Sequence, residues 1–206
     1  MKRIGILGGT FDPVHNGHLF LAANAKEQFG LEEVWLMPSP DPPHKKNSSV
    51  SNFDRRFRMT ELAVCDSPGF CVSDFEIHLP QPSYSAKTLE ALRNEYPEYR
   101  FYFIIGEDSL DHIETWYHPE TVMALATLIV AVRKEEDDNR TVEEQISYLK
   151  EKYHADILQI VSEEIDISST EIRDRIKHGK EISGLVPEAV ERYIWKEKLY
   201  IPSEKN

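Results

Sequence analysis

The chain has 206 residues, of which 40% are hydrophobic and 29% are charged, as in ordinary globular proteins. This length fits a single domain with a substantial core. The formal net charge of −12 argues against a general nucleic-acid or anionic-membrane surface, because phosphate binding on that scale needs a basic face. A small phosphorylated ligand needs only a few converging donors, so that class of ligand is not excluded.

Targeting signals are not evident in the sequence. No apolar run approaches the roughly 20 residues that span a bilayer, and the opening stretch MKRIGILGG lacks the long apolar region of a signal peptide. We therefore expect a cytoplasmic protein with no membrane partner. Cys65 and Cys71 do not have C-x-x-C spacing, so reduced structural thiols are expected.

Short apolar runs alternate with helical periodicities along the first half of the chain. Strands are predicted at 3–7, 34–37, 70–73 and 100–105, and helices at about 17–29, 53–64 and 85–95. Gly30 is placed to end the first of these helices. Ser51 and Asp54 resemble a capping pair that opens the second.

The alternation continues in the second half of the chain. A short helix is predicted after Glu107, another from Pro119, strands at 127–132 and 157–161, and helices at 168–177 and 187–196. Residues 134–154 are interpreted as a peripheral insertion with a short helix. One face of that helix carries Val142, Ile146 and Leu149.

This pattern predicts an α/β fold over residues 1–206 in one domain. Repeated strand–helix alternation is typical of a Rossmann-like, doubly wound, mostly parallel sheet with helices on both faces. A small C-terminal helical part is expected from about residue 168.

The stretch GGTFDPVHNGH, residues 8–18, directly follows the first predicted strand. Ligands of open α/β sheets bind beyond the carboxyl ends of the strands. Gly8 and Gly9 let the backbone approach a bulky anion, and Gly17 opens a helix whose N-terminus favours phosphate. The spacing matches neither G-x-x-x-x-G-K-[ST] nor G-x-G-x-x-G, so neither of those nucleotide-binding motifs applies.

Two histidines in the same stretch, His15 and His18, lie at positions i and i+3. They can point toward the same phosphates and donate N–H groups to charge that develops during phosphoryl transfer. Capping, solvent-facing or metal-binding histidines are the alternatives, and a metal site would usually need a further ligand.

A second motif, ISSTEIR, occupies residues 167–173. Ser168, Ser169 and Thr170 place hydroxyls at a predicted helix N-terminus, and Arg173 lies one turn further on, where it can contact phosphates. A plain capped helix is the alternative. Together with HNGH at 15–18, this segment resembles the H-x-G-H and I-S-S-T-x-x-R signatures of the nucleotidyltransferase superfamily.

Within that superfamily the chain is similar to the nicotinate-nucleotide adenylyltransferase family. The resemblance covers nearly the whole chain and includes PPHK at 42–45, PSYS at 82–85, IGED at 105–108 and Trp116-Tyr117. It implies adenylyl transfer from ATP to nicotinate mononucleotide in NAD biosynthesis, with nicotinate adenine dinucleotide and pyrophosphate as products. It also implies that Mg²⁺ is carried with ATP rather than held by protein ligands.

The resemblance implies roles for individual residues. The catalytic residues would be His15, His18 and Arg173. The ATP-binding residues would be Gly8, Gly9, Thr10, Phe11, Gly17, Gly106, Asp108, Ser168, Ser169 and Thr170. The residues that bind the acceptor substrate would be His44, Lys45, Tyr84, Ser85, Trp116, Tyr117 and Arg133.

Several of these residues also have a plainer interpretation. Trp116 offers a flat face to a pyridinium ring, or it is a packed aromatic residue. His44 and Lys45 are cationic donors to the mononucleotide phosphate, or part of an exposed loop. Asp108 accepts ribose hydroxyls, or caps the helix that follows it.

Two positions depart from the family pattern, and one cluster of arginines is set aside. Ser85 replaces the commoner threonine, a change that a main-chain contact to the nicotinate carboxylate should survive. Arg133 is followed by Lys-Glu rather than Pro-Gly, so the loop after it must be built differently. The cluster Arg55, Arg56 and Arg58 is interpreted as the solvated face of a helix.

Two other classes of function remain open from the sequence. One is a related nucleotidyltransferase that uses nicotinamide mononucleotide, phosphopantetheine or a cytidylyl donor. The other is a non-catalytic nucleotide-binding regulator. The sequence also leaves open whether the chain forms homo-oligomers and what the insertion does.

Overall fold

The computed structural model describes residues 1–42, 50–132, 139–161 and 167–202. Its centre is a six-stranded parallel sheet with the order β3-β2-β1-β4-β5-β6. The strands are β1 (Lys2–Gly9), β2 (Glu33–Pro38), β3 (Phe70–Val72), β4 (Tyr99–Gly106), β5 (Thr127–Val132) and β6 (Ile157–Val161). The predicted doubly wound α/β fold is confirmed, because the strands follow the predicted runs and the strand order reverses at β1.

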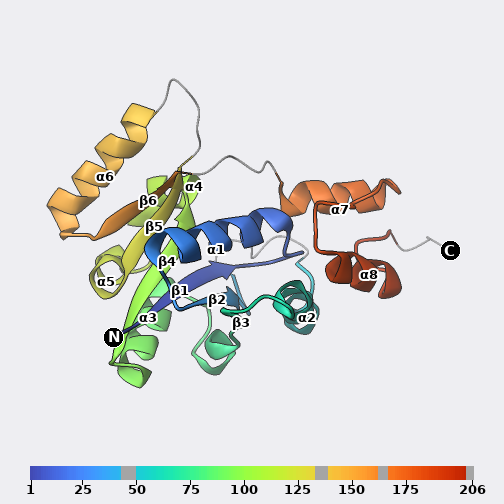
Figure 1. The fold of residues 1–206 in the computed structure, drawn as a ribbon, viewed down its shortest axis with the longest axis horizontal. Helices are drawn as coiled ribbons and strands as arrows, with labels where there is room; N and C mark the ends of the chain where they lie inside the picture. Colours follow the sequence, from blue (N-terminus) through green and yellow to red (C-terminus); the bar gives the residue numbers. More distant parts are fainter. Residues whose placement is uncertain (43–49, 133–138, 162–166, 203–206) are drawn as a thin grey trace.

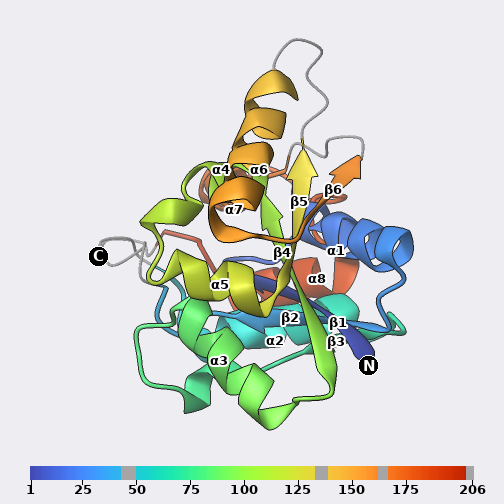
Figure 2. The same cartoon turned by 90° about the vertical axis from the view of Figure 1, so that its left-hand side faces the viewer.

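Helices cover both faces of the sheet (Figures 1 and 2). One face carries α1 (Asn16–Phe29), α2 (Phe53–Val64), α7 (Ser169–Lys177) and α8 (Glu188–Lys196). The other carries α3 (Ser85–Glu95), α4 (Glu107–Asp111), α5 (Pro119–Leu125) and α6 (Asn139–Tyr153). Two short 3₁₀ segments, η2 (Phe75–His78) and η3 (Ile113–Thr115), connect these elements.

The sheet divides the core into two hydrophobic layers. Along β4, Phe101, Phe103 and Ile105 pack into the layer with α3 to α6, whereas Tyr102 and Ile104 pack into the layer with α1, α2, α7 and α8. This alternation follows from the two-residue period of a strand. Because both faces are covered, β4 reads as a continuous apolar run.

Local signals set most helix ends, with one correction. Gly30 ends α1 in the left-handed conformation, with φ 58°, as predicted. At α2, however, the cap is Asn52, whose side chain accepts a hydrogen bond from the Arg55 N–H, and not Ser51. The Ser51 N–H instead donates to Asp12, 39 residues earlier in the chain.

The predicted insertion contains α6, which is part of the sheet's own alternation. α6 is the connection from β5 to the neighbouring strand β6. Its predicted apolar face, Val142, Ile146 and Leu149, is buried in the core. The helix was therefore predicted correctly, but it is the crossover of a βαβ unit and not an addition to the fold.

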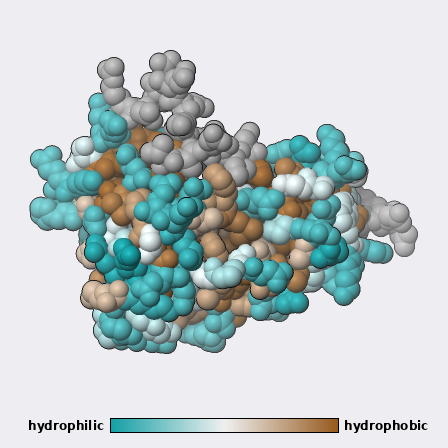
Figure 3. Space-filling view, viewed as in Figure 1, coloured by the Kyte–Doolittle hydropathy of each residue, from teal (hydrophilic) through white to brown (hydrophobic). Residues whose placement is uncertain are grey.

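The surface seen from the side of α1 is mostly hydrophilic. Hydrophobic residues gather near the middle of this face, where Figure 1 draws α1 and the strands behind it (Figure 3). Among the described residues, no helix combines the length and apolar character needed to cross a membrane. The helices α7 and α8 lie at the opposite end of the molecule from α6 (Figure 1).

Candidate active site

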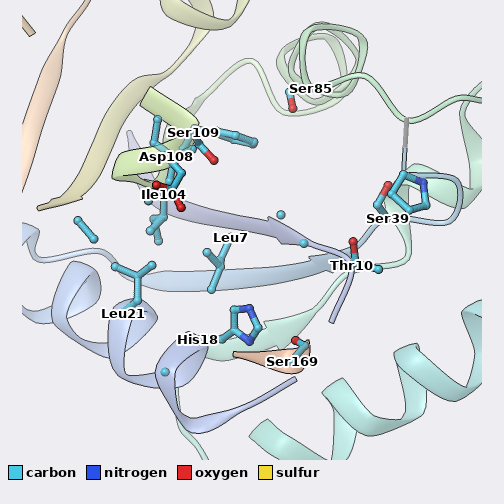
Figure 4. A pocket seen from close by; sticks show the side chains of 18 of the residues that line it. Leu7, Thr10, His18, Leu21, Ser39, Ser85, Ile104, Asp108, Ser109 and Ser169 are labelled. Carbon is cyan, nitrogen blue, oxygen red and sulfur yellow. The ribbon is translucent and has the colours of Figure 1, made fainter. Parts of the chain in front are cut away.

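A cavity of about 980 Å³ opens at the carboxyl ends of β1, β4 and β5. Figure 4 shows His18 and Ser169 on one side of it, Asp108 and Ser109 on another, and Ser85 on a third. The predicted site residues that line the cavity are Gly8, Gly9, Thr10, His15, Gly17, His18, Tyr84, Ser85, Gly106, Asp108, Trp116, Tyr117, Ser168, Ser169 and Thr170. The structure therefore gathers segments from five separate parts of the chain around one space.

Two of the predicted site residues that the structure describes do not line this cavity, and three others are not described. Phe11 and Arg173 are described but lie behind its wall. His44, Lys45 and Arg133 fall outside the described residues, so their predicted roles stay predictions.

His15 and His18 form a stacked pair at the start of α1. Their ring centroids are 3.6 Å apart. The backbone N–H of His15 donates to Nδ1 of His18 at 3.2 Å. A neutral His18 therefore carries its proton on Nε2. Phe11 contacts the edge of the His18 ring, with centroids 4.9 Å apart, and so supports this histidine from behind.

Burial makes His15 a neutral group. The residue is only 6% exposed, and this desolvation lowers the pKa of His15 from 6.5 to about 4. Its Nδ1 atom is buried and has no hydrogen-bond partner among the described residues. A neutral imidazole can still donate one N–H, so the predicted role of the pair does not require a positive charge.

The ISST segment, residues 167–170, supports the loop within residues 8–18, which we call the glycine loop. Ser168 caps α7 by accepting a hydrogen bond from the Glu171 N–H, and the Ser169 hydroxyl donates to the Pro13 carbonyl at 2.9 Å. The N-terminus of α7 thereby faces the cavity beside α1, which is the arrangement expected of an anion site.

Arg173 contacts the loop at residues 10–13 and the start of α7. Its Nη1 donates to the Asp12 carbonyl at 2.8 Å and its Nη2 to the Thr170 hydroxyl at 3.2 Å. In this arrangement the guanidinium holds the loop through the backbone of Asp12. These two bonds use two of the five N–H donors of the guanidinium, and its predicted contact with the phosphates stays a prediction.

Sequence reasoning missed Arg56, which is buried and not part of a solvated face. The side chain is 1% exposed. It donates from Nη1 to the Thr10 carbonyl at 2.7 Å and from Nε to the Ser51 carbonyl at 2.9 Å. Burial lowers its pKa, while nearby Asp12 opposes that shift. The helical period could have indicated this, because Arg56 shares one face of α2 with the buried Met59, Thr60 and Val64, whereas Arg58 lies on another face and is exposed.

Tyr200 completes the support of this loop from the C-terminal side. Its hydroxyl donates to Oδ1 of Asp12 at 2.7 Å, and Oδ2 of Asp12 accepts from the Ser51 N–H at 3.1 Å. Burial and the Asp12 carboxylate raise the pKa of Tyr200, so the phenol stays protonated and continues to donate. The loop at residues 10–13 is thus fastened on several sides.

The opposite end of the cavity is aromatic. Trp116 is half-buried and packs edge-on against Phe103, with centroids 6.2 Å apart. The rings of Tyr84 and Tyr117 stack at 4.5 Å, and the Lys87 ammonium lies over both. Ring faces and a cation near the cavity suit a flat aromatic ligand that carries an anionic group.

Asp108 lies in the first turn of α4, past the end of β4. The cap of α4 is Gly106, so the alternative interpretation of Asp108 as the helix cap is wrong. Asp108 is exposed and lines the cavity, which leaves it placed to accept ligand hydroxyls. Among the described residues, no three His, Cys, Asp or Glu side chains are grouped so that they could hold a metal ion.

The fold and the residues that line the cavity define the class of nucleotide-binding α/β proteins. Comparisons with known proteins agree with this class. A family model described as Cytidylyltransferase-like matches residues 6–175. A relative from Lachnoclostridium phytofermentans named "Probable nicotinate-nucleotide adenylyltransferase" is 43% identical over 98% of this chain and 100% of its own length. A relative of the same name from Synechococcus sp. is 42% identical over 97% of this chain and 95% of its own length.

Solved structures show the same fold. The Plasmodium falciparum nicotinic acid mononucleotide adenylyltransferase complexed with NaAD has a TM-score of 0.80 and covers 97% of this chain and 98% of its own, at 21% identity. The same enzyme complexed with APC has a TM-score of 0.78. The chain therefore belongs to the cytidylyltransferase-like family and, within it, to the nicotinate-nucleotide adenylyltransferases.

Proposed function

We propose that this chain transfers the adenylyl group of ATP to nicotinate mononucleotide, forming nicotinate adenine dinucleotide and releasing pyrophosphate. One observation carries the proposal. The glycine loop, the N-termini of α1 and α7 and the aromatic group around Trp116 all face a single cavity at the point where the strand order reverses. The names of the relatives support the same reaction.

The proposed chemistry is an in-line displacement at phosphorus. A phosphate oxygen of the mononucleotide attacks the α-phosphorus of ATP, and the bond from that phosphorus to the bridging oxygen of pyrophosphate breaks. The attacking oxygen is already ionised at neutral pH, so no general base is needed. Catalysis then consists of positioning and of stabilising the charge that develops on the phosphoryl oxygens.

His18 is the proposed donor to that charge. Its Nδ1 accepts the His15 N–H, so a neutral His18 carries its proton on Nε2, and we propose that this N–H donates to an α-phosphate oxygen or to the departing pyrophosphate. Backbone N–H groups of Gly8 and Gly9 and the N-terminus of α7 supply further positive potential. We expect His44, Lys45 and Arg133 to add cationic donors and Mg²⁺ to enter bound to ATP, as a hard cation with oxygen ligands.

A pyrophosphate-release assay tests the proposal. ATP is combined with nicotinate mononucleotide, nicotinamide mononucleotide or phosphopantetheine, and a reaction without acceptor is the control. We expect release with nicotinate mononucleotide to be the fastest. An equal or faster reaction with the amide contradicts the choice of acceptor. ATP binding by calorimetry without pyrophosphate release from any acceptor favours the non-catalytic regulator instead.

A further inference from the structure

A partly buried carboxylate in the cavity wall is not used by the mechanism above. Glu76 belongs to the short segment η2, between β3 and α3, and lines the cavity with Ser39 and Ser83. The hydroxyl of Thr88, on α3, donates to Oε1 of Glu76 at 2.7 Å and itself is fully buried. This bond fixes the carboxyl group in place at the wall.

The protein does not supply a hydrogen-bond partner for every polar group around Glu76. Burial raises the pKa of Glu76, and the hydroxyls of Thr88, Ser83 and Ser39 oppose that rise. The Ser39 hydroxyl oxygen is itself buried; it lies close enough to Glu76 to stabilise the carboxylate, but it makes no hydrogen bond of good geometry with a described residue. An unpaired buried hydroxyl is unfavourable, so one that lines a ligand cavity is well placed to pair with a ligand.

This polar wall lies between the two ends of the cavity. The Ser39 N–H donates to the Gly9 carbonyl at 2.9 Å, which places it beside the glycine loop, and Figure 4 shows it near Thr10. On the other side, Ser83 directly precedes Tyr84 of the aromatic group. The wall therefore faces whatever part of a ligand joins its aromatic ring to its phosphate.

Charge selects which part of the mononucleotide can face Glu76. The phosphate and the ring carboxylate of nicotinate mononucleotide are both anionic and would be repelled by a carboxylate in the wall, whereas the cationic ring nitrogen, which is bonded to the ribose, would be attracted to it. The ribose between the phosphate and the ring is neutral and carries two hydroxyl donors. A carboxylate accepts such hydrogen bonds well.

We propose that Glu76 and the Ser39 hydroxyl bind the ribose hydroxyls of the acceptor mononucleotide and so select a ribonucleotide acceptor. This inference rests on the proposed function, whose acceptor it describes in more detail. It makes Glu76 a substrate-binding residue of the site, with Thr88 as the residue that positions it.

The test compares acceptors that differ by one oxygen. Pyrophosphate release is measured with nicotinate mononucleotide and with its 2′-deoxy and 3′-deoxy analogues, for the wild type, Glu76→Gln and Ser39→Ala. The wild type should prefer the ribonucleotide over at least one deoxy analogue by roughly 10- to 100-fold in kcat/KM, as expected for a hydrogen bond to a charged acceptor. Glu76→Gln should lose most of that preference while the KM for ATP stays unchanged.

Two further variants separate binding from folding. Asp74→Asn changes an exposed carboxylate next to η2 and should keep the preference of the wild type. Ser39→Ala removes a hydroxyl that makes no hydrogen bond of good geometry with a described residue, so it should fold normally and still lower the preference. If Glu76→Gln does not fold, Ser39→Ala still tests the inference.

Three outcomes overturn the inference. The first is a wild type that uses both deoxy analogues as well as the ribonucleotide. The second is full retention of the preference in both Glu76→Gln and Ser39→Ala. The third is a variant effect confined to the KM for ATP. If the wild type releases no pyrophosphate with any mononucleotide, the proposed function itself fails, which is a distinct result.

Discussion

The two ends of the cavity are held in different ways. At the glycine end, residues 10–13 accept hydrogen bonds from Arg56, Ser169, Arg173 and Tyr200, which come from three distant parts of the chain. At the aromatic end, Tyr84 and Tyr117 are held mainly by ring stacking, and Tyr117 is 44% exposed. The end at which bonds are proposed to form and break is thus fixed in advance, whereas the end that recognises the acceptor ring can adjust.

This contrast has a chemical reason. Stabilising charge in a transition state requires donors that do not have to reorganise, so a loop that carries them benefits from rigid support. Recognition of a flat ring depends more on contact area than on exact angles. Substitutions at the glycine end should therefore affect turnover and folding, while those at the aromatic end should affect mainly KM.

The largest effect is expected at His18. His18→Ala removes the proposed Nε2–H donor, and kcat should fall by about 100-fold or more, as for the loss of other transition-state donors. Steady-state pyrophosphate release measures this. His78→Ala, at an exposed histidine, is the matched control. A decrease of less than about threefold in His18→Ala would remove this residue from the mechanism.

Arg56 and Arg58 provide a matched pair on one helix. Arg56→Met leaves two buried carbonyls without their donor and should lower the free energy of unfolding by about 3 kcal/mol. Arg58→Met removes only an exposed ion pair with Glu61 and should cost less than about 1 kcal/mol. Urea denaturation measures both. Equal losses would mean that the glycine end does not depend on its buried arginine.

The buried His15 should make the stability of the protein depend on pH. Its folded-state pKa of about 4 lies below the ordinary value of 6.5, so between these values the unfolded chain binds more protons. Stability is therefore full above pH 6.5, falls as the pH decreases, and loses at most about 3 kcal/mol by pH 4 from this group.

His15→Asn isolates that contribution. Urea denaturation of the variant and the wild type at pH 7 and pH 4.5 cancels the groups that they share. The difference in unfolding free energy should shift in favour of the variant at the lower pH. A difference that is the same at both pH values would show that His15 is not held neutral by burial.

The smallest effect is expected at the aromatic end. Trp116→Ala should raise the KM for nicotinate mononucleotide by about tenfold, the effect of losing one stacking or cation–π contact, while the KM for ATP stays the same. Trp195→Ala, at a partly exposed tryptophan on α8, is the control. An increase in the KM for ATP in Trp116→Ala would show that this ring contacts ATP and not the acceptor.

Most of the fold could be predicted from the sequence, because its strands are buried on both sides and its helices are periodic. The run at 100–105 and the face formed by Val142, Ile146 and Leu149 are examples of patterns that burial imposes directly. The elements that were missed, η2 and η3, are 3₁₀ segments of four and three residues. Such segments are too short to show a period, although η2 carries Glu76.

The candidate site was predicted as a set of residues rather than as a set of contacts. The motifs at 8–18 and 167–173 do meet at one cavity. The sequence could not show that Arg173 donates to the Asp12 carbonyl or that Arg56 donates to the Thr10 carbonyl. Both hydrogen bonds join segments that lie far apart in the chain. Helix periodicity indicates which face of a helix is buried, but it does not identify the distant residues that this face contacts.

The bond between Tyr200 and Asp12 joins residues that are 188 positions apart. During synthesis, the segment around Asp12 leaves the ribosome long before Ser169, Arg173 and Tyr200 are translated. Its final shape therefore waits for the last helices to dock, although the sheet can begin to pair earlier. A nascent chain that still lacks these residues would hold an unfinished loop, so nucleotide transfer would begin only late in the synthesis of each molecule.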